Sequence, residues 1–286
     1  MQPLTSKVQY HNYEPGEFTL IKERSLEETI ELIKSFPWQK EREHISIGFT
    51  NPSVCIENLD NYLKIAPSYN GKYCLYLFTD SGKIFKKVID TIDNGFDLIA
   101  DFYGGKYIEN EFNRLRNLWG VKEHFVTNDF IYVVTNYRIK RFMRQDMIMA
   151  GIFVIPFLFN PKDILLCLLV FLFAGTIMFG VNISLLLNYY RYSKNQYLRA
   201  SRGHDHFLFG MVDNYKEYTK KEISTITYYK NTNGRCPWSR FTITKITLKS
   251  GEELKFCSLL CDGFRYSDKE YDIKWALKPT AFPFIK

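Results

Sequence analysis

The sequence predicts a membrane protein of the α+β class. A transmembrane helical hairpin is expected to carry an N-terminal α+β domain and a mostly β, barrel- or sandwich-like C-terminal domain, both on the cytoplasmic side. Three observations support this prediction. Two apolar stretches, residues 147–159 and 164–187, follow each other with only four residues between them. Basic residues flank the pair on both sides, and strand and turn patterns fill the two remaining arms.

Two helices are predicted in the N-terminal arm. Ser25 and Glu28 form the pattern of a capping box, in which each side chain bonds to the other residue's backbone N–H. The apolar residues that follow repeat at helical spacing until Pro37 stops the run. A second helix is expected over residues 92–103, because it too has apolar residues on one face and is followed by the helix-terminating Gly104 and Gly105.

Between these helices the chain alternates like an antiparallel meander. Five short stretches have strand character: residues 45–49, 54–56, 62–65, 73–78 and 83–88. Asn70-Gly71 and Asp80-Ser81-Gly82 lie between successive stretches and are typical of hairpin turns. Helix, meander and helix together predict an α+β domain over residues 1–105, which is long enough to bury a core of its own.

Residues 106–141 are predicted to join this domain to the membrane segment. Ile108, Phe112, Leu115 and Trp119 recur at helical spacing, so a connector helix is expected over residues 106–124. It would serve as an ordinary domain helix, a connector or an oligomer contact. The next segment, residues 125–141, is strand-like, and we expect it to pair with the C-terminal domain.

The hairpin is assigned to residues 142–190. The 24 residues from 164 to 187 would span roughly 36 Å as a helix, enough to cross a bilayer. The alternative is a buried helix of a large soluble fold. The first stretch, residues 147–159, is short, and Phe142 and Met143 would extend it. The alternative there is an interfacial or re-entrant helix that precedes one true span.

Basic residues predict the orientation of this hairpin. They cluster on both flanks: Arg138, Lys140, Arg141 and Arg144 before it, and Arg191, Lys194, Arg199 and Arg202 after it. The turn contains only Lys162. Positive residues collect on the cytoplasmic side, so the protein is expected in the inner (cytoplasmic) membrane with both termini cytoplasmic. The six cysteines include no CxxC pair and would be free thiols in that compartment.

The C-terminal domain, residues 191–286, has the alternation of β structure. Residues 246–256 read I-T-L-x-x-G-x-x-L-x-F, which predicts a hairpin that turns at Gly251. Glu222, Ile223 and Ile226 begin a further strand before it. These motifs, placed after a basic two-helix segment, resemble bacterial membrane proteins with a pleckstrin-homology-like domain, over residues 125–260. The resemblance implies a small β-barrel or sandwich beside the membrane, and no catalytic residues.

A search for chemistry in the sequence finds little. The sequence has no GxSxG, HExxH or GxxxxGK[ST] motif. His204 and His206 would share one strand face, but no third metal ligand is evident, so a polar turn is favoured over a metal site. We therefore expect no metal, no cofactor and no enzymatic activity.

The second apolar stretch contains residues that a plain anchor does not need. Thr176, Gly180 and Ser184 repeat every four residues and form a stripe suited to close helix packing. Gly175 and Asn182 lie on nearly the opposite side of the same helix, and Asn182 would need a protein or water partner within hydrocarbon. The pattern favours assembly into a homo-oligomer, and a pore is one outcome.

Three functions follow as hypotheses. The first is an oligomeric channel or pore gated by a ligand at the cytoplasmic domains, an architecture that resembles small membrane effectors of bacterial anti-phage defence. The second is a membrane-anchored, non-enzymatic binding protein of the toxin-immunity type, with a protein partner. The third is a lipid-binding, pleckstrin-like scaffold.

An anionic ligand, such as a nucleotide or short nucleic acid, is expected at the cytoplasmic domains. The net charge is +7, and basic and aromatic residues gather after the hairpin. The candidate ligand-binding residues are Arg199, Arg202, Lys230, Arg235, Trp238 and Arg240. The alternative is that the first two contact lipid headgroups and that Trp238 belongs to a core.

Overall fold

The computed structural model describes residues 1–43, 52–106, 108–115, 121–144, 147–148, 164–265 and 271–285, with side chains described except at 164–178. The chain divides into two compact units. Unit 1 comprises Met1–Asp129 and Ser201–Gly203, and unit 2 comprises Phe130–Ala200 and His204–Lys286. Unit 1 therefore extends beyond residue 105, the boundary that the sequence predicts.

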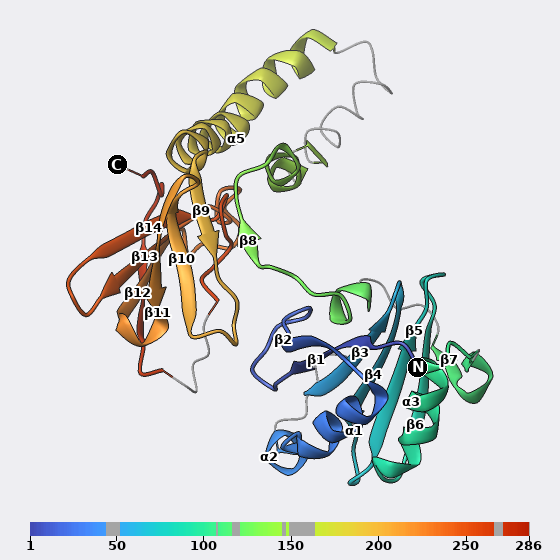
Figure 1. Ribbon diagram of the computed structural model, residues 1–286. Coiled ribbons are helices and arrows are strands. Elements are labelled where there is room, and N and C mark those ends of the chain that lie inside the picture. Colours follow the sequence, from blue (N-terminus) through green and yellow to red (C-terminus); the bar gives the residue numbers. More distant parts are fainter. Residues whose placement is uncertain are drawn as a thin grey trace. The chain divides into compact units, whose positions relative to one another are not determined.

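Unit 1 is built on a seven-stranded antiparallel sheet in the order β2-β1-β3-β4-β5-β6-β7 (Figure 1). Its strands are β1 Leu4–Gln9, β2 Thr19–Arg24, β3 Ser53–Asn58, β4 Asn61–Pro67, β5 Tyr73–Phe78, β6 Ile84–Ile89 and β7 Asn113–Leu115. Most neighbours in the sheet are neighbours in sequence, which is the meander that the turn signals predict. The exception is β1, which lies between β2 and β3.

Helices cover one face of this sheet. They are α1 Leu26–Ser35, α2 Trp38–Arg42 and α3 Phe96–Tyr103, with short 3-10 turns η1 Asp93–Gly95, η2 Glu109–Glu111 and η3 Val121–His124 elsewhere in the unit. Figure 1 shows α1 and α3 side by side on the sheet. Ile33 of α1 and Ile99 of α3 are fully buried against Val54 and Leu75 of the strands, which forms the main core of unit 1.

The opposite face of the sheet carries a buried row of unusual composition. Lys7, Cys55 and Lys64 are in register across β1, β3 and β4, and all are fully buried. Lys7 Nζ donates to Glu57 Oε2 at 2.9 Å and to Thr127 Oγ1 at 3.1 Å. These polar bonds offset the cost of burying the lysine amines.

Residues 121–128 lie over this row and close it. Phe125 is fully buried and stacks on Phe78 with ring centroids 5.4 Å apart. Lys64 Nζ donates to the carbonyl oxygen of His124 at 3.2 Å. Gly16, at φ +76°, packs so closely that a Cβ there would lie 2.8 Å from the Val126 carbonyl oxygen. A side chain at residue 16 would therefore push this cover off the sheet.

Several predictions for unit 1 can be compared with its structure. The capping box at Ser25 and Glu28 is present, with both reciprocal bonds formed. The stretch predicted as a connector helix, residues 106–124, instead forms η2, β7 and η3 where it is described. Its apolar residues join strand edges and turns: β7 pairs with β6 and η3 covers the sheet. The predicted strand at 45–49 lies outside the described residues.

Unit 2 contains two four-stranded sheets, β11-β10-β9-β8 and β14-β13-β12-β15 (Figure 1). The strands are β8 Ile131–Tyr132, β9 Gln196–Arg199, β10 His206–Met211, β11 Asn214–Thr219, β12 Ile223–Lys230, β13 Thr242–Leu248, β14 Glu253–Cys257 and β15 Lys274–Pro279, and η5 Lys220–Glu222 precedes β12. β8 pairs with β9, so residues 131–132 join the C-terminal strands as the sequence predicts. β15 pairs with β12 in parallel, whereas the other pairs in this unit are antiparallel.

The core of unit 2 lies between these sheets. Phe207 and Phe209 of β10 face Ile226 of β12 and Phe256 of β14, and each is buried. The long helix α5, Ile164–Ser193, leads into β9 and packs against the outer side of the second sheet. There Leu185 and Tyr189 are fully buried beside Phe241.

The prediction of a membrane protein is wrong. Over the residues described with side chains, no helix is both long and apolar enough to cross a membrane. The described end of α5 places its apolar residues Leu185, Leu186 and Tyr189 in a protein core, not in lipid. The first predicted stretch lies outside the described residues from 149 to 159, as does the turn at 160–163. The chain is an α+β protein that is mostly β.

Candidate functional site

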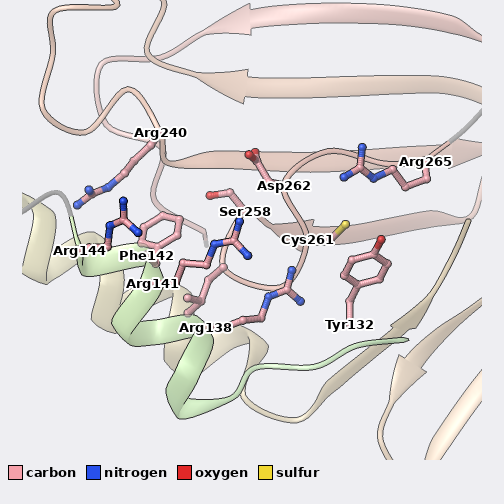
Figure 2. A pocket seen from close by; sticks show the side chains of 11 residues that line it. Tyr132, Arg138, Arg141, Phe142, Arg144, Arg240, Ser258, Cys261, Asp262 and Arg265 are labelled. Atoms are coloured by element: carbon pink, nitrogen blue, oxygen red, sulfur yellow. The ribbon is translucent and has the colours of Figure 1, made fainter. Parts of the chain in front are cut away.

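A cavity of about 650 Å³ lies in unit 2 between the helix at residues 136–144 and the loop that follows β14. Its size is typical of a site for a small molecule. Five of its lining residues are arginines: Arg138, Arg141, Arg144, Arg240 and Arg265. The others are Tyr132, Phe142, Ser258, Leu259, Cys261 and Asp262. We call this cavity the arginine pocket (Figure 2).

One helix supplies three of the arginines. Thr135 caps it: its Oγ1 accepts from the backbone N–H of Arg138 at 3.2 Å, and its carbonyl oxygen accepts from Ile139 N–H at 3.0 Å. Residues three apart lie close to one another on a helix surface, so Arg138, Arg141 and Arg144 project from the same side. Figure 2 shows all three on the helix that borders the cavity.

The opposite wall is a tight loop after β14. The Cys261 N–H donates to the Cys257 carbonyl oxygen at 3.1 Å, and the Cys261 thiol donates to the Gly263 carbonyl oxygen at 3.0 Å. Ser258 Oγ accepts from the Thr242 N–H at 3.1 Å, which ties the loop to β13. These local bonds fix the loop that carries Asp262 and Arg265.

The pocket is strongly positive. Asp262 is the one acidic side chain among its described lining residues. Burial lowers the pKa of the Arg138 guanidinium from its ordinary value, and the neighbouring Arg141 adds to this effect. A guanidinium group is charged in proteins throughout the physiological pH range, so the pocket stays positive at neutral pH. An anion that entered the pocket would relieve the repulsion among them.

Aromatic rings support two of these guanidinium groups. Arg138 lies over the ring of Tyr132, 5.1 Å from its centroid, and Arg240 lies over Phe142 at 5.1 Å. Phe142 also meets Phe241 in an edge-to-face contact, with centroids 5.0 Å apart. The guanidinium planes are thereby held in place before a ligand arrives.

Of the ligand residues that the sequence predicts, Arg240 alone lines the pocket among the described residues. Arg199 ends β9 and Lys230 ends β12. Arg235 and Trp238 lie in the loop between β12 and β13, and Trp238 stacks on Phe282 with centroids 5.3 Å apart. Arg202 belongs to the stretch assigned to unit 1.

The predicted helix-packing residues all fall on α5. Gly175 and Thr176 lie in the part whose side chains are not described. Asn182 is buried, with 3% of its surface exposed, and Gly180 is half-buried. Ser184 is exposed. Of these described residues, Asn182 therefore lies in the protein interior, whereas Ser184 of the stripe lies at the surface.

Sequence reasoning missed most of the pocket. It interpreted Arg138, Arg141 and Arg144 as a charge flank of a membrane segment, although their three-residue spacing is a signal for one helix face. Arg265 and Asp262 carry no local signal. They reach the site because the loop after β14 folds beside the helix at 136–144.

Comparison with known proteins agrees with the fold of this part of the chain. Residues 131–269 match a family model described as a PH domain. No curated protein and no solved structure matches the chain. The match supports the pleckstrin-homology-like part of the predicted resemblance, whereas nothing supports the two-helix membrane or anti-phage part. Every lining residue of the arginine pocket lies between 132 and 265, within the part of the chain that matches the PH domain model.

Proposed function

We propose that this protein is a non-enzymatic binding protein whose PH-like domain takes a phosphate-bearing ligand in the arginine pocket. The observation that carries the proposal is the convergence of five arginines on one cavity that contains a single described acid. Planar guanidinium groups bind phosphate oxygens in pairs, with charge-assisted hydrogen bonds. Five of them exceed what one phosphate group requires, so the ligand is expected to carry two or more.

The aromatic contacts favour a phosphorylated headgroup over a nucleotide. Arg138 occupies a face of Tyr132, and Arg240 occupies a face of Phe142. Phe142 is also in contact with Phe241, which leaves its ring little room to stack on a base. Asp262 can accept hydrogen bonds from hydroxyl groups, which a phosphorylated polyol offers beside its phosphates.

This proposal develops the hypothesis of a lipid-binding, pleckstrin-like scaffold and rejects the hypothesis of a channel. The channel hypothesis depends on a transmembrane hairpin, and that prediction is wrong. The same chemistry fits a phosphorylated lipid headgroup and a free polyol phosphate. The experiment must therefore separate these two sources.

The first prediction tests the pocket with the full chain. We expect binding to phosphatidylcholine vesicles that contain phosphatidylinositol phosphate, and none to phosphatidylcholine alone. Arg141→Gln should weaken this binding about ten- to a hundredfold, since a charged hydrogen bond contributes about 1.5–3 kcal/mol. Vesicle flotation measures the bound fraction. Soluble inositol trisphosphate and ATP serve as competitors: competition by inositol trisphosphate without vesicle binding would identify a free ligand.

The matched control is Arg235→Gln. Arg235 is exposed, was predicted from the sequence as a ligand residue and does not line the pocket. Its loss changes the net charge by the same amount as Arg141→Gln and should leave affinity nearly unchanged. Equal loss in both variants would mean that the chain binds anions by general charge, which contradicts a specific pocket.

A further inference from the structure

The outer edge of β15 in unit 2 is open. β15 pairs with β12 on one side, and no other described strand pairs with it on the other. An edge strand presents backbone N–H and C=O groups that have no ladder partner. Two hydrogen bonds just after the C-terminal end of β15 fix the strand in place. Thr280 N–H donates to the Lys230 carbonyl oxygen at 3.1 Å, and Trp238 Nε1 donates to the Ala281 carbonyl oxygen at 2.8 Å.

The core-facing side of this edge strand is not covered. Trp275 is in register with Ile226, and Leu277 is in register with Tyr228, so the partners point to the same face of the sheet. Ile226 is fully buried in the core of unit 2. Trp275 is 65% exposed and Leu277 is 42% exposed. The apolar face of this sheet thus continues past the region that the β11-β10-β9-β8 sheet covers.

The other side of the same strand is basic. Lys274 and Lys278 alternate with the apolar pair, and their neighbours on that face include Lys245 and Lys255. Lys278 lies over the Tyr229 ring, 5.7 Å from its centroid. Glu253 pairs with Lys245 at 2.7 Å, and it is the one acidic residue on that face of the four strands β12 to β15 among the described residues. The open edge is therefore apolar on one face and positive on the other.

We infer that β15 is a docking site for an extended peptide segment of a partner protein in which acidic and apolar residues alternate. Such a segment adds as a further strand, so its backbone pairs with the open edge. Its apolar side chains cover Trp275 and Leu277. Its carboxylates, on the opposite face, reach Lys274 and Lys278.

Two other occupants fit this edge less well. A second copy of β15, paired antiparallel about Ala276, would place Lys274 against Lys278, and like charges directly opposite are destabilising. A lipid surface favours apolar and basic side chains on the same side, whereas here they lie on opposite faces of one strand. An acidic, alternating strand satisfies the backbone, the apolar face and the charge together.

The test uses the full chain and a fluorescein-labelled synthetic peptide of about eight alternating glutamate and valine residues. We expect saturable binding by fluorescence anisotropy, and slower amide hydrogen exchange over residues 274–279 when the peptide is bound. The double variant Lys274→Glu, Lys278→Glu should weaken binding about tenfold or more, and Trp275→Ser should do the same. A peptide of alternating lysine and valine should not bind.

The controls separate this edge from other basic regions. Lys216→Glu, Lys249→Glu changes two exposed lysines away from β15 and matches the charge change of the first variant. It should retain binding, and so should Arg141→Gln in the arginine pocket. The absence of saturable binding would overturn the inference. Equal loss of peptide binding in the lysine control, or loss of peptide binding in Arg141→Gln, would overturn it too. A dimer or a vesicle contact that depends on Trp275, found in place of peptide binding, would also overturn it.

Discussion

The buried lysine Lys64 shows how much one side chain can depend on its surroundings. Burial lowers its pKa to about 7, and the positive Lys7 in the same row adds to that effect. Its Nζ donates to Gln9 Oε1 at 2.7 Å and to the His124 carbonyl oxygen at 3.2 Å. Burial also raises the pKa of the neighbouring Cys55 thiol to about 11, so this thiol stays protonated and unreactive at neutral pH.

The second prediction follows from the Lys64 pKa. Above pH 7 the folded protein releases this proton, whereas the unfolded chain holds it to about pH 10.4. The unfolded state therefore binds more protons between these values, so the free energy of unfolding should rise with pH, by up to about 1.4 kcal/mol per unit. Urea unfolding between pH 7 and about 7.8, below the ordinary thiol pKa of about 8.5 at which Cys55 ionises in the unfolded chain, should show this slope. It should be reduced in Lys64→Met.

A slope equal to that of the wild-type chain in Lys64→Met would contradict this account. Met retains most of the apolar stem but removes the Lys64 donor to Gln9 Oε1, which keeps the longer hydrogen bond from Ser53 Oγ at 3.4 Å. Some loss of stability at every pH is therefore expected. The pH dependence, not the absolute stability, is the readout. A merely structural role for Lys64 would shift the whole curve and leave its slope unchanged.

Sequence reasoning at the residue scale works where the partners are close in the chain. Ser25 and Glu28 are three residues apart, and the capping box that they predict is present. Lys64 gave no signal, because its partners Gln9 and His124 are distant in sequence and meet only in the folded sheet. The arginine pocket is missed for the same reason: Arg141 and Arg265 converge through the fold.

Among the elements, the helix at 136–144 has the most direct link to function. It carries three pocket arginines and depends on the Thr135 cap. The cap orders its first turn, and the packing of Phe142 against Phe241 holds its described part in place. A substitution at Thr135 is therefore expected to change the position of this helix.

The third prediction is that Thr135→Ala weakens binding to phosphatidylinositol phosphate vesicles by severalfold. Loss of such a cap costs about 1 kcal/mol, which allows the first turn and Arg138 to fray. Hydrogen exchange over residues 138–140 should become faster. Thr135→Ser keeps the hydroxyl acceptor and should restore both properties. If Thr135→Ser fails like Thr135→Ala, the cap is not the cause.

Helices and strands were predicted best where turn-forming residues mark both of their ends in the sequence. The stretches at 62–65 and 73–78 lie within β4 and β5, and the predicted helix at 92–103 contains α3. β1 and β2 were not predicted: β1 pairs with β3 across a long connection, and β2 pairs with β1 at the edge of the sheet. The amphipathic pattern around Phe112 suggested a helix, but pairing of β7 with β6 prevailed, which is a case where tertiary contacts override local spacing.

The whole molecule consists of two units with separate cores. Unit 1 is closed on its second face by residues 121–128, in which Phe125 stacks on Phe78 and lies near Tyr62. The boundary at Asp129 therefore has a physical meaning: it includes the segment that covers the lysine row. The sequence placed the boundary at 105 because it interpreted 106–124 as a connector.

The fourth prediction compares two fragments. A fragment of residues 1–129 should unfold cooperatively on heating. A fragment of residues 1–105 lacks β7 and Phe125, so it should be less stable by at least about 3–5 kcal/mol, the cost of losing one buried phenylalanine. Circular dichroism gives the two thermal midpoints, and a hydrophobic dye reports the uncovered face. Equal midpoints with no dye binding would show that residues 106–129 add nothing to the core.

At this scale the sequence predicted an α+β chain with a β-rich, pleckstrin-like C-terminal part, and the fold and the family match bear out that much. The membrane assignment failed. Apolar composition records only that a residue avoids water, and a protein core satisfies this requirement as lipid does. Tyr189, fully buried against Phe241, is the clearest case: its neighbours became known only from the fold.

The parallel pairing of β15 with β12 has a consequence for synthesis on the ribosome. The 49 residues after Lys230, up to Pro279, take about 2–10 s to translate at 5–20 residues per second. For that interval β12 of the nascent chain lacks β15, and once β13 has been made β12 is paired on one side only. A strand left open for seconds is exposed to wrong pairing with other nascent chains, so a chaperone that binds extended segments should raise the yield of folded protein.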